Sequence, residues 1–447
     1  MGAKGSIATR KLHRSATIGL TATKVGLRHL GHVGKKKLST KSSSHEQEDA
    51  RIKHEEDIGK TLFKALNQLK GTALKASQIL SMEADLLPEG IRRELSGACY
   101  KATPLNRALV DKVFRDQFGQ SPGRIFDDFD TKAFAAASLG QVHRAKLLSG
   151  EAVAVKVQYP GIAASIKSDV KMLGGILSLF SASTDLMPDK NIIDTVLDEI
   201  SIQLHREVDY FQEAESLKSF KDKIENERII VPSIYEDYSS ERILTTELLT
   251  GFHLDEWLET KPSQDEKNAY GQLLFDFFFD SFFELGVVHA DPHPGNFLFM
   301  EKGKLGLLDF GCVRQMDRCF TNTISDYYKF LIDHHTVKPD YKTLRGFYED
   351  LELSKEEMTD DEFRTILQPQ LDIIQKWMIE PYLYDEFDFT HREWPDIKIA
   401  DTRKITPFMK EINRNLLYFD RTYRGMIMLL SKLEATVKTG NKWIGAR

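Results

Sequence analysis

The residues whose types and spacing could do chemistry lie close together, between positions 289 and 311. The segment HADPHPGN at 289–296 contains Asp291 and Asn296, five residues apart, and an Asp-Phe-Gly triplet begins at Asp309. An Asp can orient a hydroxyl group and accept its proton, and Asn and Asp oxygens suit Mg²⁺. This order predicts phosphoryl transfer, with Asp291 as the catalytic residue and Asn296 and Asp309 as metal ligands.

The same segment has two other interpretations. His289, Asp291 and His293 alternate, so on an extended segment they would face one side and could form a metallohydrolase site. We find no further histidine cluster that completes the coordination shell. A structural turn after a buried helix would explain the polar residues, but it explains neither the Asp-Phe-Gly triplet nor a lysine upstream.

The upstream lysine is Lys156, in the alternating segment VAVKV. On a strand, its ammonium group could reach the α- and β-phosphates of a nucleotide and pair with a carboxylate from a helix. Glu207 and Glu213 are the candidate partners, and we favour Glu207. We also assign Glu247, near the end of a predicted strand, to the nucleotide-binding residues.

A run of small residues precedes the lysine strand, where nucleotide-binding lobes of kinases carry a glycine-rich loop. Alanines keep such a loop small but lack the positive-φ freedom that lets glycines fold closely over phosphates. We interpret the run as a modified nucleotide-covering loop. Its candidate residues are Ala135, Ala136, Ala137, Ser138 and Gly140.

The hydrophobic periodicity predicts elements in an order that suits this chemistry. Helices come first, then a strand hairpin, further long helices, a buried helix with a narrow acidic stripe, and a second short hairpin. This order predicts an α+β, two-lobed protein-kinase-like fold with an N-terminal helical extension and a C-terminal helical region. The predicted strands are 134–148, 152–158, 229–231, 242–247, 297–300 and 305–308; the predicted helices are 162–182, 191–222 and 270–286, with mostly helix and no clear strand pairing over 318–447.

Charge and composition divide the chain further. The net charge is −6, but the first 45 residues contain ten Lys and Arg and no Asp or Glu, so −16 remains on the other 402. We predict a flexible basic arm (1–45), a helical extension (46–122), a nucleotide-binding N-lobe with inserted helices (123–250) and a helical C-lobe (251–447). The C-lobe carries the catalytic loop and the Asp-Phe-Gly triplet.

The composition also bears on partners and compartment. A negative net charge does not suit a dedicated nucleic-acid binder, so no nucleic-acid partner is expected. The three cysteines lack CxxC spacing, which makes a reducing compartment the default, and no segment is long and apolar enough to span a bilayer. We expect a cytoplasmic protein, peripheral on a membrane if the arm binds lipid, or a mitochondrial one if the arm is a transit peptide.

Taken together, the alanine run, the lysine strand, the Glu207-Val-Asp-Tyr210 segment, HADPHPGN and the Asp-Phe-Gly triplet resemble the UbiB/AarF family of atypical protein-kinase-like proteins. The resemblance runs from about residue 60 to residue 315. It implies ATP and Mg²⁺ as ligands, and a lipid or quinone precursor as a further ligand. It also implies ATP hydrolysis coupled to lipid handling in place of protein phosphorylation.

The resemblance gives a role to Lys75-Ala-Ser77-Gln78, which is similar to the family's KxGQ motif. In the family this motif lies in a helical extension that covers the nucleotide pocket and blocks protein substrates. Lys75 and Gln78 are retained and join the nucleotide-binding candidates, whereas Ser77 replaces the motif's glycine. Some members carry a pair of C-terminal membrane helices; none is expected here, so membrane contact would be peripheral, through the basic arm.

The sequence therefore predicts a Mg²⁺-dependent, ATP-binding atypical kinase or ATPase that supports isoprenoid-quinone or other lipid metabolism. Two alternatives stay open. The pattern HxDxHPxN also resembles aminoglycoside and choline phosphotransferases, although the alanine run and the Lys75 extension argue against a small-molecule kinase. The other alternative is a non-catalytic, nucleotide-gated scaffold. All the catalytic side chains are present, which argues against it.

Overall fold

The computed structural model contains two compact units. The first comprises the described residues up to Phe211 together with Tyr235–Thr246, and the second comprises Gln212–Ile234 and the described residues from Glu247 onward. Each unit has its own hydrophobic core. The described residues are 106–137, 139–183, 190–337, 339–355, 357–392, 395, 408 and 413–444, with isolated positions at 53, 56, 57, 59, 60 and 76.

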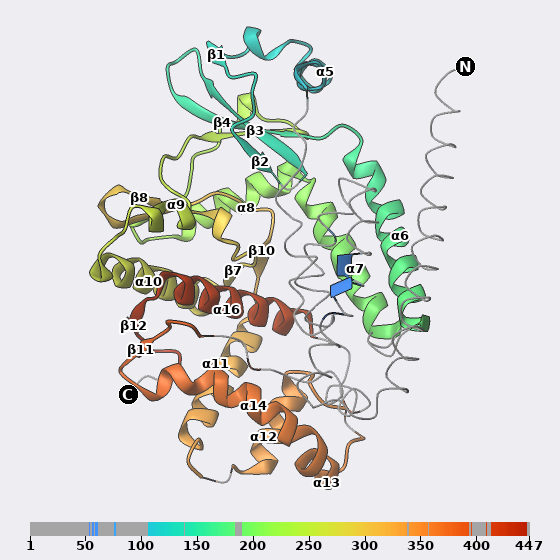
Figure 1. Ribbon diagram of the computed structural model, residues 1–447, viewed down its shortest axis with the longest axis vertical. Helices are drawn as coiled ribbons and strands as arrows, with labels where there is room; N and C mark the ends of the chain where they lie inside the picture. The colour runs from blue at the N-terminus through green and yellow to red at the C-terminus, as the bar shows by residue number, and fades with distance from the viewer. Residues whose placement is uncertain are drawn as a thin grey trace. The chain divides into compact units, whose positions relative to one another are not determined.

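The first unit is built on a five-stranded sheet in which β1, β3, β4 and β6 follow one another and β2 pairs with β3 (Figure 1). In β4 the valines at 153, 155 and 157 are fully buried, whereas Lys156 is only half-buried. Such alternation is what a strand with one covered face requires. The strands are β1 (Asp128–Phe129), β2 (Ala135–Ala137), β3 (Gly140–Lys146), β4 (Ala152–Gln158) and β6 (Ile243–Glu247).

Helix α5 (Arg107–Phe118) packs against the valine face of the sheet. It begins at Asn106, whose side chain accepts a hydrogen bond from the Leu109 amide, and ends at Gly119, which has a φ of 70°. A short polar cap and a glycine in the left-handed region are frequent helix boundaries. The buried cluster that α5 and the sheet share contains Val110, Val113, Phe114, Phe126, Ala145, Leu147, Val153, Val155, Val157 and Ile243.

Strands β2 and β3 form a tight antiparallel hairpin in which Ala137 lies opposite Gly140. The prediction of one strand over 134–148 is therefore wrong, because the chain reverses between these two residues. Three successive alanines carry no inward and outward alternation, so the pattern gives no sign of the reversal. The predicted pairing with the next strand is confirmed, since β3 and β4 are antiparallel along their whole length.

The helix predicted over 162–182 is confirmed as α6 (Ile162–Ser183), which packs against α7 (Lys190–Glu207). Gly174 makes this approach close: an added Cβ there would lie 2.9 Å from the Leu197 Cδ1.

The single helix predicted over 191–222 is wrong, because α7 ends at Glu207 and a separate helix, α8 (Tyr210–Lys223), follows. At the break, the Gln158 side chain donates a 2.8 Å hydrogen bond to the Val208 carbonyl. This tertiary bond engages a carbonyl that a continuous helix would use in its own ladder. The sequence pattern contains no trace of it.

The second unit is organised around α10 (Gln264–Phe279) and the π-helical turn η3 (Asp280–Glu284) that continues it. Its phenylalanines are buried, and its acidic residues form the exposed stripe that the sequence predicts. The buried helix predicted over 270–286 is thus confirmed, although it begins earlier, at a capping box centred on Ser263.

Helix α16 (Arg414–Leu433) and strand β12 (Thr436–Lys438) pack on α10, and Figure 1 shows α10 and α16 side by side. A glycine permits this approach, since an added Cβ on Gly271 of α10 would lie 2.5 Å from the Ala435 Cβ. The left-handed residue Glu434, with a φ of 54°, ends α16 and turns the chain into β12.

Three small sheets complete the second unit. The hairpin predicted at 297–300 and 305–308 is confirmed as β8 and β9, with β5 parallel to β9. Strands β7 and β10 pair antiparallel, as do β11 and β12, so the absence of strand pairing expected after residue 318 is wrong. The bounds are β5 (Ile229–Ile230), β7 (Val287–His289), β8 (Phe297–Met300), β9 (Lys304–Leu307), β10 (Val313–Gln315) and β11 (Glu386–Asp388).

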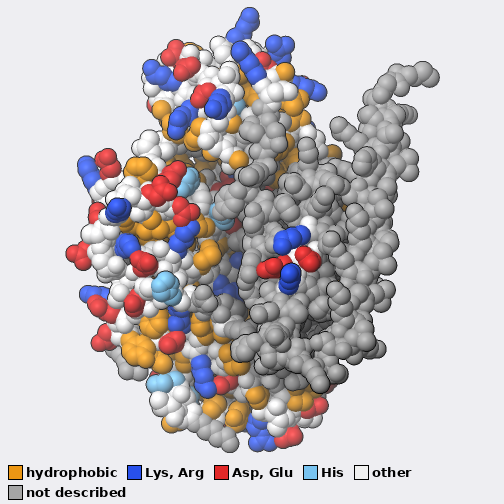
Figure 2. All heavy atoms as spheres, in the orientation of Figure 1, with side chains coloured by type: hydrophobic (Ala, Val, Ile, Leu, Met, Phe, Trp, Pro, Cys, Tyr) orange, Lys and Arg blue, Asp and Glu red, His pale blue; other side chains and the backbone are white. Residues whose placement is uncertain are grey.

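The remaining helices surround these elements. They are η1 (Pro122–Arg124), η2 (Glu236–Tyr238), α9 (Leu254–Glu259), η4 (Pro294–Asn296), η5 (Glu301–Gly303), α11 (Arg318–Asp333), α12 (Tyr341–Asp350), α13 (Asp360–Glu362), η6 (Phe363–Leu367), α14 (Gln368–Ile379) and η7 (Glu380–Leu383). Among the described residues, no helix combines the length and apolarity that crossing a bilayer requires. On the face drawn in Figure 2, acidic and basic side chains of the described residues are interspersed.

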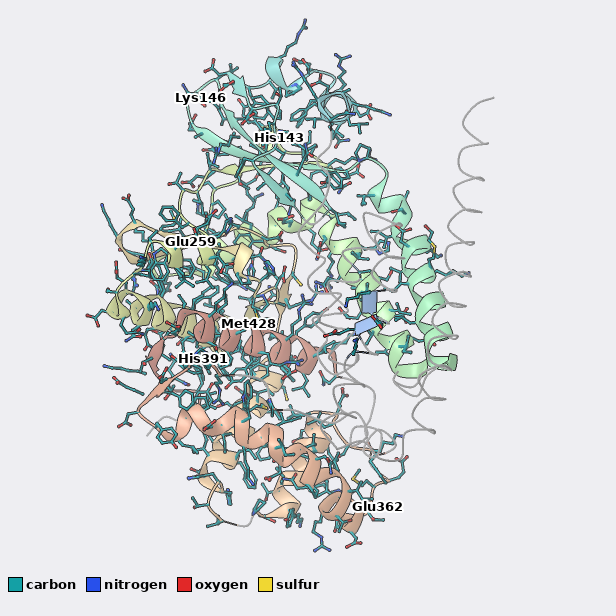
Figure 3. The ribbon with its side chains drawn as sticks, viewed as in Figure 1. His143, Lys146, Glu259, Glu362, His391 and Met428 are labelled. Carbon is teal, nitrogen blue, oxygen red and sulfur yellow. The ribbon has the colours of Figure 1, made fainter. Side chains whose placement is uncertain are left out.

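Strand β3 buries two polar side chains, Gln141 and His143; the latter is labelled in Figure 3. The His143 Nδ1 lies 2.8 Å from the Asp130 carbonyl oxygen, which can only accept, so Nδ1 carries a proton. The other ring nitrogen, Nε2, lies 2.8 Å from the Gln141 amide nitrogen and therefore accepts from it. The ring stacks on Phe129, and burial lowers the pKa of His143.

A lowered pKa has a defined consequence for stability. As the pH falls below the reference value of 6.5, the unfolded chain binds a proton at His143 before the folded chain does. We expect the free energy of unfolding to fall by up to about 1 kcal/mol between pH 6.5 and 5.5 through this residue. Urea unfolding of the wild type and His143→Gln at pH 7.5 and 5.5 checks this, and equal losses in the two proteins would contradict it.

Gly425 of α16 faces Pro292, and an added Cβ would lie 2.0 Å from the proline Cγ. A proline ring cannot rotate away, so Gly425→Ala should lower the free energy of unfolding by about 1–3 kcal/mol. Gly346→Ala is the matched control, because nothing lies within 4 Å of a Cβ added at that helical glycine. It should be neutral or slightly stabilising in the same denaturation measurement. Equal effects at both sites would show that the contact with Pro292 does not limit stability.

Candidate active site

The sheet of the first unit positions Lys156 against an aromatic ring. Its Nζ lies 5.2 Å from the centroid of the Tyr210 ring, a cation–π distance. The hydroxyl of Tyr210 in turn lies beside Gly140, where an added Cβ would be 2.9 Å from it and 2.5 Å from the Val157 carbonyl oxygen. Glycine is therefore required at 140 by close backbone approach. The start of α8 is thus packed against both the end of the alanine hairpin and the lysine strand.

The predicted nucleotide-covering residues lie on β2 and at the start of β3. Ala136 is exposed, its neighbours Ala135 and Ala137 are half-buried, and Gly140 is buried. The described part of this hairpin thus carries only alanine and glycine at these positions, with no large side chain. Ser138, Lys75 and Gln78 lie outside the described residues.

The three predicted glutamates have different surroundings. Glu207 is half-buried and is the last residue of α7, next to the break that Gln158 stabilises. Glu213 is buried in the first turn of α8. Glu247 is exposed, and its Oε2 accepts hydrogen bonds from the backbone amide and hydroxyl of Ser233, both at 3.2 Å.

In the second unit, Asn296 lies five positions after Asp291 and its side chain hydrogen-bonds to that residue. The Asn296 Nδ2 donates to the Asp291 backbone carbonyl and to its Oδ2, each at 3.0 Å. The short helix η4 makes this contact possible, and the side chain of His293 caps the helix by accepting from the Gly295 amide. The spacing that the sequence singles out thus places an Asp and an Asn side by side in a tight loop.

Asp309 is brought next to this loop by backbone pairing. The Leu308 amide donates to the Asn296 carbonyl at 3.1 Å, and the Asp309 carbonyl lies 2.5 Å from the His289 Nε2. The Asp309 Oδ1 accepts from the Gly311 amide at 3.0 Å. Phe310, fully buried, anchors the triplet edge-on against the His289 ring at 5.8 Å.

These contacts bear on which metal the loop could hold. The two histidines are engaged in the loop itself, His289 with a carbonyl and His293 with an amide. No cluster of three or more His, Cys, Asp or Glu side chains suited to a metal occurs in the part of the chain that the structure describes. Because the Asn296 amide nitrogen faces Asp291, its oxygen is the atom left to bind a cation. This oxygen and the Asp309 carboxylate are hard donors, the kind that Mg²⁺ prefers, so their chemistry would suit this ion.

The sequence analysis did not identify two side chains that contact the predicted site residues. Tyr210 lies within the Glu207-Val-Asp-Tyr210 segment, but nothing in the pattern indicates its contact with Lys156. Arg421, on α16, lies with a guanidinium nitrogen 3.5 Å from the Asp291 Oδ1. The two residues are 130 positions apart, so no local signal could have paired them.

The chain is similar to a known domain family and to several named proteins. The chain matches the model of the ABC1 atypical kinase-like domain over residues 97–345. The mitochondrial atypical kinase coq-8 of Caenorhabditis elegans is 30% identical over 391 residues, which are 84% of this chain and 49% of that protein. The mitochondrial atypical kinase COQ8B of Rattus norvegicus is 31% identical over 345 residues, 75% of this chain and 64% of that protein. The chain spans about half the length of the curated relatives it matches.

A solved structure supports the fold. The complex of Rv3197 with erythromycin from Mycobacterium tuberculosis superposes with a TM-score of 0.60 at 24% identity, covering 88% of this chain and 96% of that one. At this level of identity the likeness concerns the fold alone, and it confirms the predicted kinase-like fold. With the domain match covering more than half of its length, the chain belongs to the ABC1 atypical kinase-like family, as do relatives named COQ8 and AarF-domain kinases.

Proposed function

We propose that this protein binds ATP with Mg²⁺ and cleaves its terminal phosphoanhydride bond in support of isoprenoid-quinone or other lipid metabolism. The observation that carries the proposal is the Asp291–Asn296 pair, held by two 3.0 Å hydrogen bonds. Asp309 lies next in sequence to Leu308, whose amide donates to the Asn296 carbonyl. Family membership supports a kinase-like use of these residues.

Each residue has a role that its chemistry permits. Asp291 orients the attacking hydroxyl or water and accepts its proton. Asn296 and Asp309 would hold Mg²⁺, which neutralises phosphate charge when bound. In the first unit, Lys156 binds the α- and β-phosphates and Glu207 holds the lysine.

The lipid assignment rests on the relatives and on the basic arm. Relatives matched over much of the chain are named as mitochondrial atypical kinases, including COQ8B. The ten basic residues of 1–45 could bind anionic lipid, at about 1 kcal/mol for each residue near the surface. We propose that the protein acts peripherally at a membrane, in mitochondria if the arm is also a transit peptide. The segment with Lys75 and Gln78 would cover the nucleotide and exclude protein substrates.

Hydrolysis of ATP by the purified protein, with and without anionic vesicles that contain a quinone-precursor mimic, tests the proposal. We expect lipid-stimulated hydrolysis. Asp291→Asn should lower kcat by about 10²-fold or more, because the proton acceptor is lost. Asp309→Asn should lower it at least as much, because a carboxylate that neutralises phosphate charge through the metal is lost.

Asp326→Asn is the matched control, since it removes the same charge from an exposed position on α11 and should leave kcat unchanged. Nucleotide binding without turnover under every lipid condition would contradict the proposal and favour a nucleotide-gated scaffold. Phosphate transfer to a soluble aminoglycoside or choline would instead favour a small-molecule phosphotransferase.

Deletion of residues 1–45 tests the membrane assignment separately. The truncated protein should sediment less with vesicles containing phosphatidylserine than the full chain does, and the difference should shrink as salt screens the charges. Neutral phosphatidylcholine vesicles provide the control. Sedimentation that is unchanged by the deletion would show that the arm does not hold the protein at the membrane.

A further inference from the structure

Helix α16 contacts the catalytic loop and its partner strand at three points on one side. Tyr418 accepts a 2.7 Å hydrogen bond from Arg314 of β10, whose guanidinium also lies over its ring at 4.4 Å from the centroid. Arg421 pairs with Asp291, and Gly425 lies against Pro292. Residues at spacings of three, four and seven share one side of a helix, so these contacts form a single stripe.

A neighbouring row of side chains on α16 is less buried than this stripe. Asp420 and Arg424 are only partly buried and form an ion pair of 2.7 Å with each other. Met428, labelled in Figure 3, is 48% exposed and continues this row. Arg414, the first residue of α16, is exposed and carries the same charge as the buried Arg421.

Both ends of α16 are fixed to the rest of the unit. At its start, Asn413 caps the helix and donates to the Glu352 carboxylate at 3.0 Å. At its end, Glu434 pairs with Lys267 of α10 at 2.5 Å, and its carbonyl accepts from Gln264 at 2.7 Å. A guanidinium carried by a helix anchored in this way has a defined position relative to the loop.

The Asp291 carboxylate is held at both of its oxygens. Asn296 donates to Oδ2 at 3.0 Å, and Arg421 lies 3.5 Å from Oδ1. The two side chains of the ion pair are only 14% and 6% exposed, respectively for Asp291 and Arg421. At this burial a charge needs a partner, and a rigid guanidinium fork fixes the direction of a carboxylate better than an ammonium does.

We infer that Arg421 is a positioning residue for Asp291: it holds the carboxylate in the orientation that phosphoryl transfer requires, through a helix far along the chain from the catalytic loop. The inference rests on the proposed function of Asp291. Arg421 acts on the carboxylate and not on the nucleotide. Its loss should therefore reduce turnover without weakening nucleotide binding.

The test compares Arg421→Gln, Arg421→Lys and the matched control Arg414→Gln for ATP hydrolysis by the full chain. Arg421→Gln should lower kcat by about 10-fold or more while KM for ATP changes by less than about twofold. Arg421→Lys, which keeps the charge, should recover part of the loss. Arg414→Gln should behave as the wild type, because Arg414 is exposed at the start of α16.

A double-mutant cycle with Asp291→Asn tests whether Arg421 affects turnover through the Asp291 carboxylate. If Arg421 acts through Asp291, then Asp291→Asn/Arg421→Gln should turn over as slowly as Asp291→Asn alone, within about twofold. Unchanged kcat in Arg421→Gln, or multiplicative losses in the double variant, would overturn the inference. If Arg421→Gln does not fold, Arg421→Lys carries the same comparison.

Thermal unfolding keeps this inference separate from the proposed function. If the wild type shows no turnover, the proposed function fails. The interaction between Arg421 and Asp291 can still be measured from the Tm values of the variants. Each single variant leaves one buried charge without its partner, so the decrease in Tm of the double variant should be smaller than the sum of the two single decreases. Additive decreases would then overturn the positioning of Asp291 by Arg421.

Discussion

A largely buried carboxylate, that of Asp291 in the loop at 289–296, is the constraint on which this part of the second unit depends. The Asp291 side chain is only 14% exposed, and removing a carboxylate from water without compensation is costly. The tight η4 turn brings the Asn296 amide to one oxygen, and α16 brings a guanidinium to the other. Three features fix the position of α16: its packing on α10, its capped ends, and the close approach to Pro292 that Gly425 permits.

The sequence predicts those parts of the fold that local periodicity defines. The valines of β4, the acidic stripe of α10 and the β8–β9 hairpin were located because alternating burial leaves a pattern. The β2–β3 reversal was missed because three alanines show no alternation. The α7–α8 break was missed because the Gln158 hydrogen bond found there comes from another element. The pairing of β11 with β12 joins three-residue strands about fifty positions apart, beyond any local signal.

The residues of the candidate site also divide into those that local spacing predicts and those that only tertiary contacts bring in. Asp291, Asn296 and Asp309 were predicted because loop chemistry fixes their spacing, and the structure brings the first two into contact and pairs the backbone of the third beside them. Tyr210 and Arg421 contact the predicted site residues Lys156 and Asp291 through pairings that only folding creates. Glu207, Glu213 and Glu247 stay predictions with different surroundings, and the motif around Lys75 lies outside the described residues.

The most direct test of the account is a calorimetric titration of the wild-type chain with a non-hydrolysable ATP analogue, with Mg²⁺ and with EDTA in its place. The account predicts saturable binding that depends on Mg²⁺ and is weakened by Asn296→Ala, because that substitution removes an oxygen ligand for the metal. Binding of equal affinity in EDTA, or no binding in either condition, would contradict the claim that this loop handles a metal-bound nucleotide.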